Sequence, residues 1–234
     1  MSDGRRTVDS MKALLQSCQG ADSQQTINFY DSWCETYEQD FELLNYRAPH
    51  HGVSFLHANF SGSREDVQVL DVACGSGLVA KLMTELGFRN FVGVDASKGM
   101  LEVAAKTGLY QDLKLALLGT EPLPASNNTF DVVILVGGLG PGFIPVRIVR
   151  ELCSAAKPGG LVCLVRGEHR GAPSDRYKHE LHTELKLMEE AGLWSLLATK
   201  HIDRYMVDAQ ANTDGDQQGE LFISGMAYLY RKAN

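Results

Sequence analysis

Two aspartates and two glycines are spaced along residues 69–95 in a way that suits a nucleotide-like ligand. The apolar run at the start of this stretch predicts a buried parallel strand. Gly75 and Gly77 follow in a tight turn that opens a helix over residues 77–86. Glycine lets the backbone bend sharply and approach a ligand closely, because it has no Cβ atom. The first N–H groups of the helix point at whatever occupies the turn.

The two aspartates narrow the choice of ligand. Asp71 lies inside the strand end, four positions before Gly75, and Asp95 ends a second strand at residues 91–96. A carboxylate at the tip of the second strand can accept hydrogen bonds from both hydroxyls of a ribose. The glycine turn also fits a loose dinucleotide fingerprint, but that fingerprint normally has an apolar residue where Asp71 stands. The acidic residue therefore favours another ligand over a nicotinamide or flavin dinucleotide.

Residues 69–80 and 91–100 resemble the first two motifs of the class I S-adenosylmethionine-dependent methyltransferases. The chain as a whole is similar to the methyltransferase-like group named after the Williams–Beuren syndrome chromosome region. Ala73 stands where the family usually has its first glycine, which is a conservative departure because alanine is the next smallest residue. The resemblance implies methyl transfer from S-adenosylmethionine, with S-adenosylhomocysteine as product, by in-line displacement. The implied acceptor is a small molecule or, as the less favoured choice, a protein.

The resemblance also implies which residues bind the cofactor. In this family the residues after the strand-two acid lie along the adenosine, and the tip of strand four lies beside the methionine part. An aromatic residue of an N-terminal segment joins them. The family often has Gly-Asp-Ala after strand three, but this chain lacks that aspartate, so backbone groups there would meet the adenine edge. The matching positions are Tyr37, Asp71, Ala73, Gly75, Gly77, Asp95, Ala96, Ser97, Met100, Gly119, Thr120 and Val136.

Strands and helices alternate along most of the chain. Strands are expected at residues 69–74, 91–96, 113–119, 130–136 and 161–166, and helices at 77–86, 97–107 and 145–156. A helix at 175–191 and two long antiparallel strands, 193–208 and 220–231, complete the pattern. This order predicts an α/β fold with a Rossmann-like, doubly wound, mostly parallel seven-stranded sheet and an antiparallel C-terminal strand. Its ligand should lie at the carboxyl ends of the strands.

The segment before the first strand is predicted to be helical. Apolar residues recur every three or four positions over residues 23–44, which indicates one helical face, and a second helix is expected at 48–59. That face could simply pack on the core, or it could close over the ligand as a lid. The expected organisation is a mobile tail at 1–22, with a short helix at 8–19, and one methyltransferase domain at 23–234, with a helical lid at 23–60 and a core at 67–234.

Composition limits the partners and the compartment. The chain has 234 residues, 44% hydrophobic residues and a net charge of −7, with no block of lysine or arginine, so no nucleic-acid partner is expected. No membrane span or signal segment is expected either. Five cysteines without CxxC spacing indicate a reducing, intracellular location, cytoplasmic or nuclear. We expect a monomer.

Catalytic groups are harder to assign, and no catalytic residue is named. His169, just past the fifth strand, is the best-placed general base, although a histidine in a surface loop is the simpler interpretation. His179 and His182 suggest a metal half-site only weakly, so no metal is expected. The aspartate-rich loop at 209–219 is better explained by turn chemistry than by calcium binding. No Asn/Asp-Pro-Pro-Tyr motif follows strand four, which disfavours amines of nucleic acids as acceptors.

Three functions stay open on the sequence. The first is a methyltransferase that uses S-adenosylmethionine. The second is a catalytically silent protein that binds this cofactor as a scaffold, and the third is an oxidoreductase of the NAD type. The pattern of residues does not name the methyl acceptor.

Overall fold

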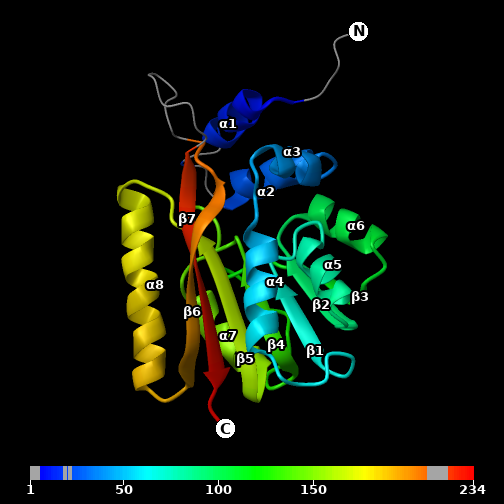
Figure 1. Cartoon of the computed structure of the whole chain (residues 1–234), viewed down its shortest axis with the longest axis vertical. Helices are drawn as coiled ribbons and strands as arrows, with labels where there is room; N and C mark the ends of the chain where they lie inside the picture. Colours follow the sequence, from blue (N-terminus) through cyan, green and yellow to red (C-terminus); the bar gives the residue numbers. More distant parts are fainter. Residues whose placement is uncertain (1–5, 18–19, 21–22, 210–220) are drawn as a thin grey trace.

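The computed structural model describes residues 6–17, 20, 23–209 and 221–234. Seven strands form one sheet in the order β3-β2-β1-β4-β5-β7-β6 (Figure 1). The strands are β1 (Gln68–Val72), β2 (Asn90–Asp95), β3 (Tyr110–Leu115), β4 (Phe130–Val136), β5 (Ala156–Gly167), β6 (Trp194–Val207) and β7 (Phe222–Lys232). The helices are α1 (Val8–Ser17), α2 (Ser23–Trp33), α3 (Tyr37–Leu43), α4 (Ala48–Asn59), α5 (Leu78–Glu85), α6 (Lys98–Lys106), α7 (Ile148–Ala155) and α8 (Ala172–Glu190).

The strand directions confirm the predicted α/β, doubly wound sheet. Strands β3, β2, β1, β4 and β5 pair in parallel, and β7 pairs antiparallel with both β5 and β6. The first strand lies inside the sheet between β2 and β4, and the chain winds outward from it in both directions. In such a sheet the switch point beside the first strand opens a crevice at the carboxyl ends, where ligands bind.

Two hydrophobic layers cover the faces of the sheet. One layer contains buried residues of α4 and α5, and the other contains buried residues of α7 and α8. Strand β4 shows why the sequence reads as one apolar run, because Val132 and Ile134 face the first layer while Val133 and Leu135 face the second. The central strands are therefore covered on both faces, and only the ends of the sheet remain for a ligand.

Two strands differ from their predicted bounds. Strand β3 was expected at 113–119 but runs over Tyr110–Leu115, because β2 ends at Asp95, whose partner is Leu115. Residues after Leu115 have no strand to pair with there. Strand β5 begins at Ala156 rather than at residue 161. The glycine-containing segment at 157–160 therefore lies inside β5, where the pairing of β5 with β4 shifts register.

The predicted helix over residues 23–44 is two helices. It breaks between Trp33 and Tyr37, where the Thr36 amide donates to the Trp33 carbonyl at 3.1 Å. The buried carboxylate of Asp40 stabilises the break, since it accepts from the Trp33 indole at 2.7 Å and from the Thr36 hydroxyl at 2.6 Å. A buried carboxylate needs such partners. Periodicity alone missed this bend because both helices keep their aromatic residues on the same side.

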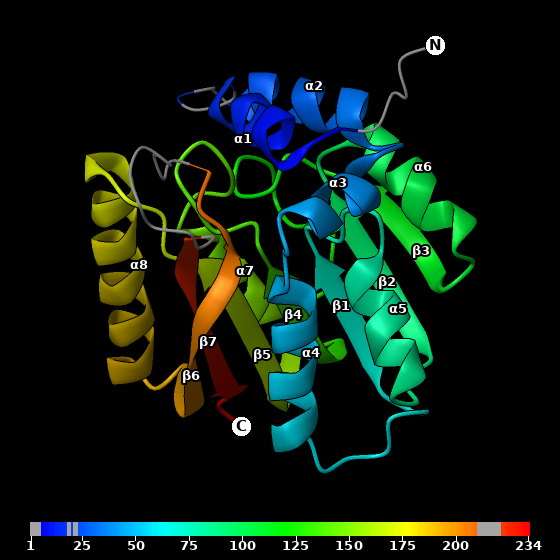
Figure 2. The same ribbon diagram turned by 45° about the horizontal axis from the view of Figure 1, so that its top comes forward.

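Helices α1, α2 and α3 lie across the carboxyl end of the sheet (Figure 2). Helix α4 does not, because it packs on the face of the sheet, where Gly52 approaches Val136 and Val165. Of the lid predicted at 23–60, only α2 and α3 therefore lie over the carboxyl end of the sheet (Figure 2). The helix expected at 8–19 is α1, and its Met11 is buried in the first layer. The mobility of residues 1–22 stays a prediction, and residues 1–5, 18–19 and 21–22 lie outside the described ones.

Among the residues that the structure describes, no helix combines the length and the apolar character that crossing a membrane requires. The predicted loop at 209–219 and the first residue of the predicted last strand lie almost wholly outside the described residues.

Candidate functional site

The tips of β1 and β2 are joined by the carboxylate of Asp95. One of its oxygens accepts from the backbone N–H of Gly75 at 2.8 Å, and the other accepts from that of Ser97 at 2.9 Å. The Ala96 amide is a further donor. A carboxylate has about four lone pairs, so these bonds leave it able to accept from a ligand. Burial raises the pKa of Asp95, and the backbone donors oppose that shift.

Asp71 lies deeper, in the middle of the sheet, and is 1% exposed. Its Oδ2 accepts a hydrogen bond of 2.7 Å from the hydroxyl of Tyr110, the first residue of β3. The phenol passes over Gly93 of β2, the residue paired with Asp71, where a Cβ would come within 2.9 Å of the Tyr110 ring. Tyr110 is a site residue that the sequence analysis missed. A glycine inside a strand, between an aspartate and a tyrosine on the flanking strands, is the signal that could have indicated it.

The environment of Asp71 is poorly suited to a charge. Burial raises its pKa from 3.8 to about 7; the Tyr110 hydrogen bond opposes this shift, and the charge of Asp95 adds to it. The second oxygen, Oδ1, is buried and has no hydrogen-bond partner in the described residues. An unpaired buried oxygen costs free energy unless something supplies a donor. The site is therefore incomplete in the protein alone.

The turn between β1 and α5 uses left-handed backbone at three residues. Ala73, Gly75 and Gly77 have φ of 56°, 54° and 92°. Nothing lies within 4 Å of the place where a Cβ of Gly75 would stand, so this side of the turn is open. Gly77 faces the Tyr110 ring instead. The departure at Ala73 is therefore less conservative than its size suggests, because an alanine there adopts a conformation that favours glycine.

Helix α2, part of the predicted lid, is hydrogen-bonded to the start of α6, on the predicted adenosine side of the site. Asp31 of α2 accepts from the Ser97 hydroxyl at 2.6 Å and from the Gly99 amide at 2.9 Å. Ser97 also caps α6, as predicted, through a bond from the Met100 amide at 3.1 Å. Gly99 lets α2 come this close, because a Cβ there would stand 3.0 Å from the Asp31 carbonyl oxygen. Asp31 was not foreseen as a site residue.

The loop after β3 uses its own polar groups. The Thr120 amide donates to the Leu117 carbonyl at 2.9 Å, and the Gly119 carbonyl accepts from the Arg147 guanidinium. Gly119 also packs on Pro145, where a Cβ would lie 2.8 Å from the proline ring. The predicted contacts of Gly119 and Thr120 with an adenine edge stay predictions, and these internal bonds compete with them.

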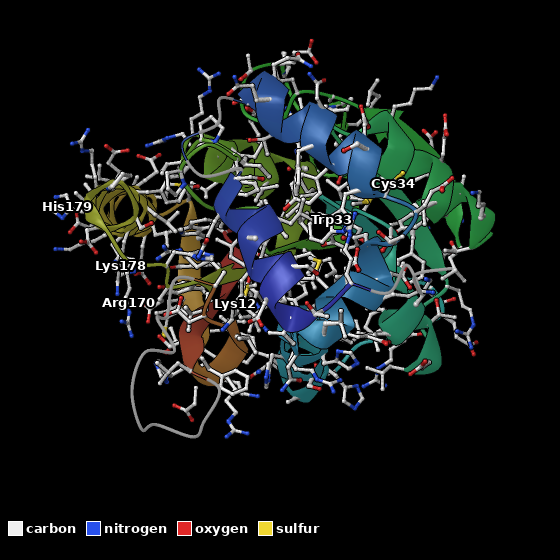
Figure 3. All side chains as sticks on the ribbon, turned by 90° about the horizontal axis from the view of Figure 1, so that it is seen from above. Lys12, Trp33, Cys34, Arg170, Lys178 and His179 are labelled. Atoms are coloured by element: carbon white, nitrogen blue, oxygen red, sulfur yellow. The ribbon has the colours of Figure 1, made fainter. Side chains whose placement is uncertain are left out.

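The tip of β4 lies under an aromatic cluster. Val136 is buried, and Gly137, which follows it with φ of 82°, is exposed. Tyr37 packs against Trp33 and Phe41 with ring centroids 5.1 and 4.7 Å away. Seen from above, Trp33 lies near the centre of the molecule beside α1 and α2 (Figure 3). Burial raises the pKa of Tyr37, the first residue of α3, and Tyr46, Tyr30 and Asp95 add to the shift.

The histidines divide as the sequence suggested. His179 points outward from α8 (Figure 3), and His182 contacts the Tyr228 hydroxyl at 2.8 Å. No group of three or more His, Cys, Asp or Glu side chains placed to hold a metal occurs in the described part of the chain. His169 lies beside Gly167, and desolvation together with the charge of Arg166 lowers its pKa, while Asp208 opposes this shift. It is therefore a neutral histidine close to the carboxyl end of β5.

Comparisons with known proteins agree with this geometry. A methyltransferase-domain family profile matches residues 69–160. Human methyltransferase-like protein 27 is 41% identical over 199 residues, which cover 85% of this chain and 80% of that protein. The ubiquinone biosynthesis O-methyltransferase of Parvibaculum lavamentivorans is 32% identical over 100 residues, or 42% of this chain and 39% of its own. The solved [4+2]-cyclase SpnF has the same fold, with a TM-score of 0.64 at 19% identity over 91% of this chain and 96% of its own.

The chain belongs to the class I S-adenosylmethionine-dependent methyltransferases, the family of human methyltransferase-like protein 27. This membership decides against the oxidoreductase alternative.

Proposed function

We propose that this protein transfers a methyl group from S-adenosylmethionine to a small-molecule acceptor by in-line displacement. The supporting observation is the clamp at Asp95, which is fixed by the N–H groups of Gly75 and Ser97 beside an open glycine turn. S-adenosylmethionine supplies a methyl group that is already activated. The chain therefore has to bind and orient the two reactants and exclude water from them, rather than activate the methyl group.

The residues present fit this cofactor in two ways. Asp95 keeps free lone pairs at a strand tip, where a ribose would present two hydroxyl donors. The unpartnered Oδ1 of Asp71 offers a buried hydrogen-bond acceptor to a donor group of the ligand. Ala96, Ser97 and Met100 would flank the adenosine, and Val136 and Tyr37 the methionine end.

The choice of a small molecule as acceptor rests on two supports. The quinone-pathway relative is named an O-methyltransferase, and the chain lacks an Asn/Asp-Pro-Pro-Tyr motif after β4. A protein acceptor is the alternative. A base is needed only where the acceptor loses its proton during attack, and His169 is the neutral histidine nearest the carboxyl end of β5. The proposal also includes the Williams–Beuren group and an intracellular site, which suits the free thiols of Cys34, Cys74, Cys153 and Cys163.

Calorimetry with S-adenosylmethionine, S-adenosylhomocysteine and NADH tests the cofactor. We expect the two adenosyl compounds to bind and NADH not to bind. Labelled S-adenosylmethionine added to a metabolite extract then tests the reaction, and we expect transfer of label to a compound of low molecular mass. Binding without any transfer across broad extracts would instead indicate a silent, cofactor-binding protein.

A further inference from the structure

Tyr205 of β6 reaches across two strands toward the tip of β4. Gly225 of β7 pairs directly with Gly167 of β5, and the Tyr205 ring lies over both. A side chain on Gly225 would overlap the ring, and a Cβ on Gly167 would lie 2.8 Å from its Cε1 atom. The Tyr205 hydroxyl ends 3.5 Å from the place where a Cβ of Gly137 would stand. Because Gly167 and Gly225 have no side chains, the buried Tyr205 phenol can cross them and reach the predicted methyl-transfer region.

Tyr46, in the link between α3 and α4, meets Tyr205 at this point. Its hydroxyl is also against Gly137, and the two rings are edge to face with centroids 5.5 Å apart. The two hydroxyls therefore meet at Gly137, and the Arg47 amide donates to the Tyr205 carbonyl at 3.0 Å. Two neighbouring phenols carry two O–H protons, and a hydrogen bond between them would use only one. The Tyr46–Tyr205 pair therefore keeps one O–H that can donate to a third group.

The pair lies at the edge of the core and has aromatic surroundings. Tyr205 is buried, whereas Tyr46 is half-buried and Gly137 is exposed, so the pair meets solvent on the Tyr46 side at the end of β4. Tyr46 packs on Phe41 at 4.5 Å, and Tyr30 packs on both Tyr37 and Phe143 at 6.1 and 6.2 Å. Burial raises the pKa of both members of the pair, so both phenols stay neutral at physiological pH. Neutral donors among ring faces and edges suit a flat, uncharged molecule that carries oxygen.

We propose that the Tyr46–Tyr205 pair is the acceptor-binding end of the site, and that it takes a planar aromatic molecule bearing a hydroxyl or carbonyl oxygen. This inference rests on the proposed function. The pair donates its free O–H to an oxygen of the acceptor, while the acceptor ring packs against the aromatic side chains beside Tyr46, where Phe41 lies. Tyr46 and Tyr205 are positioning residues, because they hold the acceptor beside Val136 without taking part in bond making.

The test uses 1,4-dihydroxynaphthalene, kept reduced, with the full-length protein saturated with S-adenosylhomocysteine. Calorimetry compares wild type, Tyr205→Phe, Tyr46→Phe and a control, Tyr230→Phe. Tyr230 lies on β7, as Gly225 does, and its ring stacks on Trp194 with centroids 4.2 Å apart. We expect the first two variants to bind the probe roughly fivefold to tenfold more weakly, as for loss of one neutral hydrogen bond. The control variant and the affinity for S-adenosylhomocysteine should not change. Phenylalanine keeps each ring, so the fold should survive, and near-ultraviolet circular dichroism checks this.

Cyclohexane-1,4-diol separates the two parts of the inference, because it has the oxygens without the planar ring. We expect it not to bind. The inference is overturned if the probe fails to bind, if Tyr205→Phe and Tyr46→Phe bind it as tightly as wild type, or if the saturated diol binds equally well. A wild-type protein that does not bind S-adenosylhomocysteine would instead refute the proposed function, so the two failures are distinguishable.

Discussion

The two ends of the crevice solve different problems with different chemistry. At β1 and β2 the site consists of carboxylates, and Asp95 is held rigidly by backbone N–H donors. At β4 and β5 it consists of the neutral phenols of Tyr46 and Tyr205, which pack against glycines. Fixed charges suit a polar ligand that is the same in every reaction. Aromatic rings and one free hydroxyl suit recognition of the shape and orientation of an acceptor. The comparison indicates that affinity for the cofactor and choice of acceptor are separable in this protein.

The buried Asp71 gives the largest expected effect, on stability. Its pKa of about 7 in the folded protein means that the folded state holds a proton which the unfolded state releases above its ordinary value of 3.8. The free energy of unfolding should therefore fall as pH rises from about 4 to 7, by roughly 4 kcal/mol from this group. Urea unfolding at a series of pH values, for wild type and Asp71→Asn, measures this.

The free energy of unfolding of Asp71→Asn should lack this dependence on pH. Relative to wild type, the variant should therefore become more stable by a similar amount between pH 4 and 8. Other groups, such as His169, titrate in both proteins and cancel in the difference. Parallel stability curves for the two proteins would show that Asp71 is not held near a pKa of 7.

Asp95→Ala comes next, and it acts on the cofactor end alone. Loss of hydrogen bonds to a charged group should weaken binding of S-adenosylmethionine by about 1.5–3 kcal/mol. Calorimetry checks this, with Asp112→Ala as control, because Asp112 is an exposed carboxylate on the neighbouring strand β3. Unchanged affinity in a folded Asp95→Ala protein would refute the ribose assignment. Binding of 1,4-dihydroxynaphthalene to the Tyr46–Tyr205 pair should change less than cofactor binding does.

Asp31 links the lid to the cofactor end. Asp31→Ala removes the bonds from the Ser97 hydroxyl and the Gly99 amide, and should loosen α2 by about 1–2 kcal/mol. Amide hydrogen exchange should then be faster across α2, and S-adenosylhomocysteine should restore less protection than in wild type. Ser32→Ala, on the same helix, is the control, since Ser32 bonds only within α2. Equal protection of α2 with and without ligand in wild type would remove the lid interpretation.

The smallest effect is expected at Ala73, which has φ of 56°. Ala73→Gly relieves a left-handed conformation that costs an L-residue about 1–2 kcal/mol, but it also frees the unfolded chain by about 0.4–1 kcal/mol. The balance should be a stabilisation between about 0 and 1.6 kcal/mol, seen as an equal or higher melting temperature. A clear loss of stability would show that the Ala73 methyl group makes a packing contribution larger than the strain.

The cofactor end was predictable because its parts are contiguous. A strand, a glycine turn, a helix and the Asp95 tip lie within 27 residues, from 69 to 95, and each has a local signature. The doubly wound, mostly parallel sheet was predictable from the alternation of strands and helices. The bound of β3 was missed because the length of an edge strand is set by its partner, here the end of β2.

Contacts between distant residues were not predictable at either end. At the cofactor end Tyr110 meets Asp71 across 39 positions and Asp31 meets Ser97 across 66, and neither pair has a local pattern. At the other end Tyr46 and Tyr205 look like ordinary apolar positions in the sequence. The pairing of Gly167 with Gly225 gives Tyr205 room to reach Tyr46, and that pairing depends on where β7 inserts in the sheet.

Gly225 sits in a strand that need not touch either reactant, yet it decides how far a neighbouring aromatic ring can extend. Adding a single methyl group there would displace the Tyr205 ring and, with it, the hydroxyl beside Gly137. Under the proposed roles, a change in β7 would then alter selectivity for the acceptor without touching any residue assigned to the adenosyl group.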